Sequence, residues 1–118
     1  VFVHSTFDEF PDHRLVHRLV MDAIGAAAGP WYSEAGGEPP HLVSEVLGYE
    51  VWTPHPRFQK LVDISETLPL KLEALACHRS QLESVRYDTA VSGLASYRGA
   101  LSPRGFCYAE AFEVISSC

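Results

Sequence analysis

The residues best suited to chemistry gather in one short acidic segment, Asp8-Glu9-Phe10-Pro11-Asp12-His13. An apolar run precedes this segment and an amphipathic stretch follows it, so we expect it to connect a strand to a helix. Ligands of α/β sheets gather at the carboxyl ends of strands, where a histidine in the first helical turn can point back. His13 is therefore a candidate metal ligand and Asp12 a candidate carboxylate to orient it. A surface histidine beside a helix-capping aspartate would give the same pattern.

Two other groups of polar residues invite a functional interpretation. His17 lies four residues after His13 on the same expected helix face, but no Glu lies between them to act as a base, so we interpret His17 as a solvated or edge residue. His78 and Gln81 lie in a polar run where a second amphipathic helix should finish. They are either helix-end groups in solvent or donors that face a sugar or an acyl group.

The closing apolar segment contains a carboxylate that needs an explanation. Glu110 lies within the run Phe106 to Phe112, and a buried carboxylate requires a partner or a raised pKa. An ion pair to an arginine or a bond from a backbone donor is the expectation we favour over a functional site. Tyr108 is expected to pack, with its hydroxyl at a polar edge.

Composition narrows the classes of protein. The 118 residues are 47% apolar and 20% charged, which fits one globular domain or part of one. The formal net charge of -6 argues against a nucleic-acid interface, and no apolar run approaches the roughly 18 residues of a membrane span. We expect no signal peptide, because the start lacks a basic segment and a cleavage pattern.

Cysteine usage and the first residues add two expectations. Cys77, Cys107 and Cys118 are odd in number and show no CxxC spacing, so we expect reduced thiols in a cytoplasmic chain. The first two are expected to be buried packing residues. Because the chain opens directly on an apolar run without an initiator Met, we expect it to be part of a longer protein.

The hydrophobic periodicity predicts an α/β layer in which strands and helices alternate. The helix after the acidic segment should bury one face made of Leu15, Val16, Leu19 and the apolar residues that repeat after them. Ser65 to Thr67 offer N-cap chemistry for the second helix. The predicted strands cover residues 1–4, 41–52, 58–64 and 106–115, and the predicted helices cover residues 12–28, 68–82 and 85–98.

Four segments, in order, resemble the PIG-L/LmbE-like zinc-dependent N-deacetylases. Phe10-Pro11-Asp12-His13-Arg14 is similar to that family's second signature, usually His-Pro-Asp-His. The segments Tyr49–Pro54, Lys71–Gln81 and Tyr108–Phe112 resemble its following strand, late helix and closing strand. The resemblance extends over residues 1–118 and corresponds to the C-terminal part of a single such domain.

The resemblance implies a partial Rossmann-like fold whose N-terminal strands are absent, and a cytoplasmic hydrolase. Members remove the acetyl group from an N-acetylglucosamine conjugate, with a zinc ion that activates water. It implies that His13 is a zinc ligand, Asp12 a catalytic residue, and His78, Gln81 and Tyr108 substrate-binding residues. The expected partner is a small amino-sugar conjugate. No nucleic-acid partner and no membrane span are expected, and a homo-oligomer is one of the possibilities.

The chain departs from the family pattern in two ways. The His-Pro-Asp-Asp segment that supplies two further ligands and the base does not occur in it, and three protein ligands are usual for catalytic zinc. Phe10 occupies the place of the histidine that stabilises the oxyanion, and Phe cannot donate a hydrogen bond. The expectation is a fragment that is inactive by itself. A non-catalytic relative that binds carbohydrate or assists assembly is the main alternative, and a generic α/β interaction domain is a third.

Overall fold

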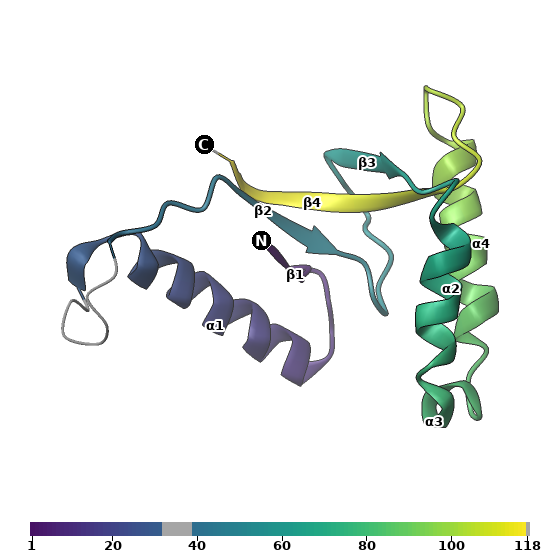
Figure 1. Ribbon diagram of the computed structural model, residues 1–118, viewed down its shortest axis with the longest axis horizontal. Coiled ribbons are helices and arrows are strands. Elements are labelled where there is room, and N and C mark those ends of the chain that lie inside the picture. Colours follow the sequence, from purple (N-terminus) through teal and green to yellow (C-terminus); the bar gives the residue numbers. More distant parts are fainter. Residues whose placement is uncertain (32–38, 118) are drawn as a thin grey trace. The chain divides into compact units, whose positions relative to one another are not determined.

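The computed structural model describes residues 1–31 and 39–117, which form a mixed α/β structure (Figure 1). Its four-stranded sheet has the order β1-β2-β4-β3. The chain forms two compact units, one made of Val1–Lys60 with Phe112–Cys118 and the other of Leu61–Ala111. In chain order the elements are β1 (Phe2–His4), α1 (Pro11–Ala27), β2 (Glu45–Tyr49), β3 (Lys60–Asp63), α2 (Leu68–Ala76), α3 (Arg79–Leu82), α4 (Tyr87–Ala100) and β4 (Ala109–Ser117).

The first unit is built on a parallel pair of strands. β1 pairs with β2 so that Phe2 lies opposite Leu47 and His4 opposite Tyr49. β2 pairs on its other side with β4 in the antiparallel sense, with an irregularity at Val46/Leu47. Because β1 and β2 are parallel, their carboxyl ends meet at one edge of the sheet. Side chains that follow the two strands are therefore brought together there.

Helix α1 begins with Pro11 at its first position, as its fixed φ favours, and it packs on β1. The prediction of a fully buried apolar face is wrong for Leu15, Val16 and Leu19, which are 55%, 41% and 58% exposed. A helix of 17 residues is about 26 Å long, whereas a strand of three residues covers only about 10 Å. Most of the apolar face consequently extends beyond the strand that it contacts.

The second unit is a small helical cluster, in which α2 and α4 lie side by side (Figure 1). Ile64, Leu68 and Ala95 form its buried centre, with Leu72 and Tyr108 packed against them. The predicted continuous helix over 68–82 is instead two helices, because His78 has φ -86° and ψ 58°, outside the helical region.

Several local predictions are corrected by the structure. Ser65 does not cap α2 but accepts the N–H groups of Cys107 and Tyr108, and Thr67 occupies the N-cap without a side-chain cap bond. Cys77 and Cys107 are exposed free thiols rather than buried packing residues, since one follows a helix end and the other lies in a loop.

Three further predictions from the sequence concern Glu110, the bounds of the second strand and the thiol of Cys118. Glu110 forms the expected ion pair, although its partner is Lys71 rather than an arginine. The strand predicted over 41–52 is confined to Glu45–Tyr49. Cys118 lies outside the described residues. Among the helices within 1–31 and 39–117, none is long and apolar enough to cross a membrane.

Two glycines of α4 provide a matched test of its packing. A Cβ at Gly99 would lie 2.6 Å from the carbonyl oxygen of Cys107, whereas a Cβ at Gly93 would meet nothing within 4 Å. We expect Gly99→Ala to lower the free energy of unfolding by about 1–3 kcal/mol because backbone must move. Gly93→Ala should raise it by about 0.5–1 kcal/mol. Denaturant unfolding of both variants measures this, and the reverse order would contradict the packing of Gly99 on this loop.

Candidate functional site

A continuous series of aromatic rings in contact, the aromatic ladder, lies at the carboxyl ends of β1 and β2. The His4 and His13 rings stack with their centroids 4.1 Å apart, and the Tyr49 ring is tilted against His4 at 5.0 Å. Phe10 follows at 5.6 Å from His13, and Trp52 stacks on Phe10 at 5.1 Å with an interplanar angle of 23°. The ladder therefore joins the end of β1, the start of α1 and the segment after β2.

Asp8 is the carboxylate that accompanies His13. Its Oδ2 lies 2.9 Å from His13 Nδ1, a close polar contact that lacks the alignment of a linear hydrogen bond. Its Oδ1 accepts the N–H of Phe10 at 3.0 Å. Burial raises the pKa of Asp8, but the contacts from His13 and Phe10 outweigh burial and the net pKa is lowered. Asp8 is therefore a buried anion at neutral pH, and Nε2 is the nitrogen of His13 left for a ligand.

His4 is held between His13, Tyr49 and α1. The Tyr49 hydroxyl lies 3.3 Å from His4 Nε2, and His17 Nδ1 donates to the His4 carbonyl at 2.7 Å. Burial and, next, the charge of His13 lower the pKa of His4, while burial and the charge of Asp8 raise the pKa of Tyr49. We therefore expect a neutral imidazole beside a phenol that keeps its proton. His4 Nδ1 is buried without a hydrogen-bond partner among residues 1–31 and 39–117, which costs stability.

Glu113 of β4 holds the start of the loop that carries Asp8. Its Oε2 accepts the Thr6 N–H at 3.0 Å and the Ser5 hydroxyl at 3.1 Å, and its Oε1 accepts the Thr6 hydroxyl at 2.6 Å. Ser5 Oγ in turn accepts the N–H of Phe7 at 3.0 Å. Burial raises the pKa of Glu113, but the bonds from Thr6 and Ser5 and the charge of His55 outweigh burial and lower it. We call Ser5, Thr6 and Glu113 the carboxylate clamp.

His55 extends the carboxylate clamp to the segment after β2. It is only 3% exposed, its Nδ1 lies 3.2 Å from Ser5 Oγ, and its Nε2 donates to the Gly48 carbonyl at 3.1 Å. Its backbone N–H donates to Glu50 Oε1 at 2.6 Å. A Cβ at Gly48 would be tightly placed, 3.1 Å from both Glu113 Oε2 and the Ser5 Cα. These contacts fix both loops whose aromatic residues make the ladder.

The sequence-predicted site residues fall in both units. His13 lies within the ladder, whereas Asp12 is exposed in the first turn of α1, so its catalytic role stays a prediction. The substrate-binding roles of three residues of the second unit also stay predictions. They are His78 and Gln81, which are exposed at α3, and Tyr108, which is half-buried.

Sequence reasoning missed several residues of the site. His4 was overlooked as part of an apolar strand, although a histidine at the carboxyl end of an apolar strand is a usable signal. Asp8 was passed over for Asp12, and Glu113 for Glu110. His17 was interpreted as a solvated or edge residue, and its bond to the His4 carbonyl was not foreseen.

The residues described around His13 supply a single protein ligand for a zinc ion, His13 itself. A catalytic zinc usually takes three protein ligands. Over residues 1–31 and 39–117, no three side chains of His, Cys, Asp or Glu converge as a metal site. The His13–Asp8 pair suits a single ligand with its orienting carboxylate.

Comparisons with known proteins identify the class of fold. No model of a known protein family matches the chain. The chain is 30% identical to the diacetylchitobiose deacetylase of Thermococcus kodakarensis over 115 residues, which are 92% of this chain and 41% of that protein. The sheet and helices correspond to part of the LmbE-like deacetylase fold, as the solved structures below show.

Three solved structures share this fold over about half their length. The conserved protein TT1542 of Thermus thermophilus matches with a TM-score of 0.83 and 27% identity, over 100% of this chain and 52% of that one. The N,N'-diacetylchitobiose deacetylase of Pyrococcus horikoshii matches with a TM-score of 0.74 and 25% identity, over 98% and 45%. GalB, the 4-carboxy-2-hydroxymuconate hydratase of Pseudomonas putida KT2440, matches with a TM-score of 0.73 and 26% identity, over 100% and 52%. These likenesses support the deacetylase resemblance, and the chain spans about half the length of the proteins it matches.

The lowered pKa of Glu113 predicts how acid affects the fold. A carboxylate whose pKa is lower in the folded protein stabilises the fold at pH values above its ordinary pKa of 4.5. This contribution is lost as the pH falls through the lowered pKa. Glu113→Gln should therefore lower the free energy of unfolding at pH 7 by about 1–3 kcal/mol. In the variant this free energy should also fall less steeply as the pH drops below the ordinary pKa of the carboxylate. Unfolding curves from neutral to acidic pH measure both effects. Glu66→Gln, an exposed carboxylate before α2, is the control, and an acid profile of Glu113→Gln identical to the parent's would refute the carboxylate clamp.

Proposed function

We propose that this chain is part of a hydrolase that removes the N-acetyl group from an N-acetylglucosamine-type conjugate. The observation that carries the proposal is the His13–Asp8 pair at the carboxyl ends of two parallel strands. Two similar proteins, from Thermococcus and Pyrococcus, are named as deacetylases of diacetylchitobiose. A buried carboxylate on one ring nitrogen leaves the other to bind a metal, which is the usual arrangement of a metal-bound histidine.

Zinc is the metal we propose, with His13 as one ligand. Bound zinc would supply a water of lowered pKa and polarise the amide carbonyl. His13 alone does not make a complete site, so the remaining ligands and the base would come from residues beyond this chain. The contribution of this chain is to hold the imidazole between His4 and Phe10 with Asp8 against one edge.

The oxyanion donor is the part of the proposal most affected by Phe10. Phe10 stacks on Trp52, is tilted against His13, and has no polar hydrogen to donate. The nearest other imidazole is His4, whose Nδ1 lacks a partner among residues 1–31 and 39–117. If Tyr49 donates to Nε2 of a neutral His4, the proton of His4 is on Nδ1, so this buried nitrogen is a donor without an acceptor among the described residues.

Zinc content tests the incomplete site directly. We expect the chain alone to hold less than one zinc ion per chain, because one histidine is too few ligands. His13→Ala should change that content little. Elemental analysis after dialysis measures both proteins, with His41→Ala as the exposed control. Tight one-to-one zinc that His13→Ala abolishes would show that this chain completes a site by itself.

A chimera tests the reaction and distinguishes the two aspartates. In it, this chain replaces the matching part of the Thermococcus kodakarensis deacetylase, and acetate release from N,N'-diacetylchitobiose is measured. We expect Asp8→Asn to weaken zinc binding or activity by about 10–100-fold, since the carboxylate that orients His13 is lost. Asp12→Asn is the matched control and should have the smaller effect.

Other outcomes of the chimera would count against the proposal. A folded chimera that binds zinc but releases no acetate favours a non-catalytic relative or another reaction, such as the hydration that GalB's name describes. If Asp12→Asn had a larger effect than Asp8→Asn, Asp12 rather than Asp8 would be the carboxylate that orients His13.

A further inference from the structure

Phe10 and Trp52 form an exposed aromatic pair at one end of the ladder. Their rings stack at 5.1 Å and 23°, yet Phe10 is 43% and Trp52 42% exposed. Large aromatic side chains that stay exposed in a group mark binding surfaces more often than isolated ones do. Phe10 also lies 5.6 Å from the ring of His13. A ligand on the pair would therefore reach the His13–Asp8 site.

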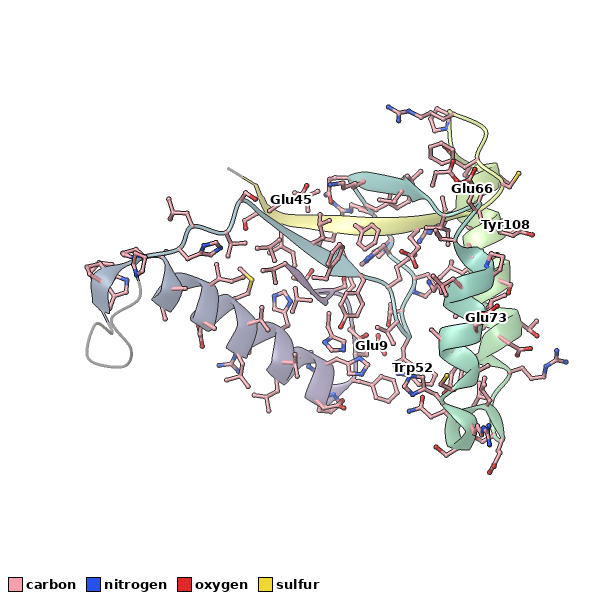
Figure 2. All side chains as sticks on the ribbon, in the orientation of Figure 1. Glu9, Glu45, Trp52, Glu66, Glu73 and Tyr108 are labelled. Atoms are coloured by element: carbon pink, nitrogen blue, oxygen red, sulfur yellow. The ribbon has the colours of Figure 1, made fainter. Side chains whose placement is uncertain are left out.

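The chemistry around the pair is acidic. Glu9 and Asp12 are exposed carboxylates on either side of Phe10 in the chain, and Asp8 is a buried one. Figure 2 shows Glu9 just before α1 begins and Trp52 on the segment after β2, with the two labels close together in that view. Residues 8–14 contain three carboxylates against one arginine, Arg14, which donates to the Glu9 carbonyl. The surroundings therefore favour hydroxyl donors and cations over anions.

We propose that Phe10 and Trp52 are a stacking platform for the pyranose ring of an amino sugar. One face of a pyranose ring carries C–H groups and is apolar, so it packs on an aromatic surface, while its equatorial hydroxyls project sideways to the carboxylates of Glu9 and Asp12. An amine freed from its acyl group is a cation, which aromatic faces and carboxylates both attract. The choice of an amino sugar rests on the proposed function, but the platform itself rests on the stacked and exposed rings.

The platform also gives Phe10 a role that its sequence position does not predict. A histidine in its place could donate to an oxyanion, whereas Phe provides a larger apolar face and stacks on Trp52. With Phe instead of His at position 10, the site loses a hydrogen-bond donor and gains an apolar surface beside His13 on which a sugar ring can pack. Phe10 is accordingly a substrate-positioning residue.

Binding of N,N'-diacetylchitobiose and of glucosamine to the full 118-residue chain tests the platform, by calorimetry or saturation-transfer NMR. We expect Trp52→Ala and Phe10→Ala each to weaken binding of the disaccharide by about tenfold, and Trp52→Phe by less than about threefold, because the apolar face is kept. Tyr97→Ala removes an exposed aromatic side chain from α4 and is the control, with unchanged affinity expected. Thermal unfolding of every variant establishes that it is folded.

The results also separate the platform from the reaction. Unchanged affinity in folded Trp52→Ala and Phe10→Ala, or no saccharide binding by the folded parent chain, would overturn the platform even if the chimera releases acetate. Weakened binding in those variants together with a chimera that releases no acetate would sustain the platform and reject the deacetylation. Weakened binding in Tyr97→Ala to the same extent would also overturn the platform, because the effect would not be specific to Phe10 and Trp52.

Discussion

The first unit depends on one carboxylate, that of Glu113 near the C-terminal end of the chain. It accepts three hydrogen bonds from Ser5 and Thr6, directly after β1 ends. Through Ser5 it also reaches His55, which holds the segment after β2. Both loops that flank His13 are thus fixed from β4, whose Glu113 lies 108 residues from Ser5 in the first of these loops. Because Glu113 is ionised under neutral conditions, the same group that orders these loops makes them sensitive to acid.

The electrostatics of the ladder follow from its packing. Two imidazole rings whose centroids are 4.1 Å apart would repel if both were charged. Burial and the neighbouring His13 keep His4 neutral, while the anion of Asp8 faces the His13 ring. Tyr49 keeps its proton for the same reasons of burial and charge. The two neighbouring histidines therefore differ, because His4 is kept neutral while His13 faces the carboxylate of Asp8.

Local sequence patterns predicted most elements of the fold. The helix after the acidic segment was confirmed within one residue at each end, because Pro11, the apolar spacing and Gly29-Pro30 all agree there. The break at His78 was missed, since the sequence near it contains neither Gly nor Pro. The exposed face of α1 was missed as well, because periodicity shows which residues share a face but not how much of that face is covered.

The site was less predictable than the fold because its contacts are distant in sequence. His13 could be found from its position after a strand, but its partner Asp8 lies in an irregular loop whose path the pattern does not define. Glu113 bonds residues 107 and 108 positions away, and no local periodicity indicates which of two strand carboxylates points to them. The choice of Glu110 over Glu113 reflects this limit, since Glu110 faces Lys71.

The loop between β1 and α1 has a consequence for backbone motion. The amide hydrogens of Thr6, Phe7 and Phe10 are all taken by side-chain oxygens rather than by a ladder of carbonyls. The loop is thus ordered without being secondary structure, and its order depends on the ionisation of the Glu113 and Asp8 carboxylates. Solvent exchange of these amide hydrogens would respond to local opening of the loop separately from global unfolding. The segment that presents His13 is thus ordered by two carboxylates and by the hydroxyl and carbonyl of Ser5.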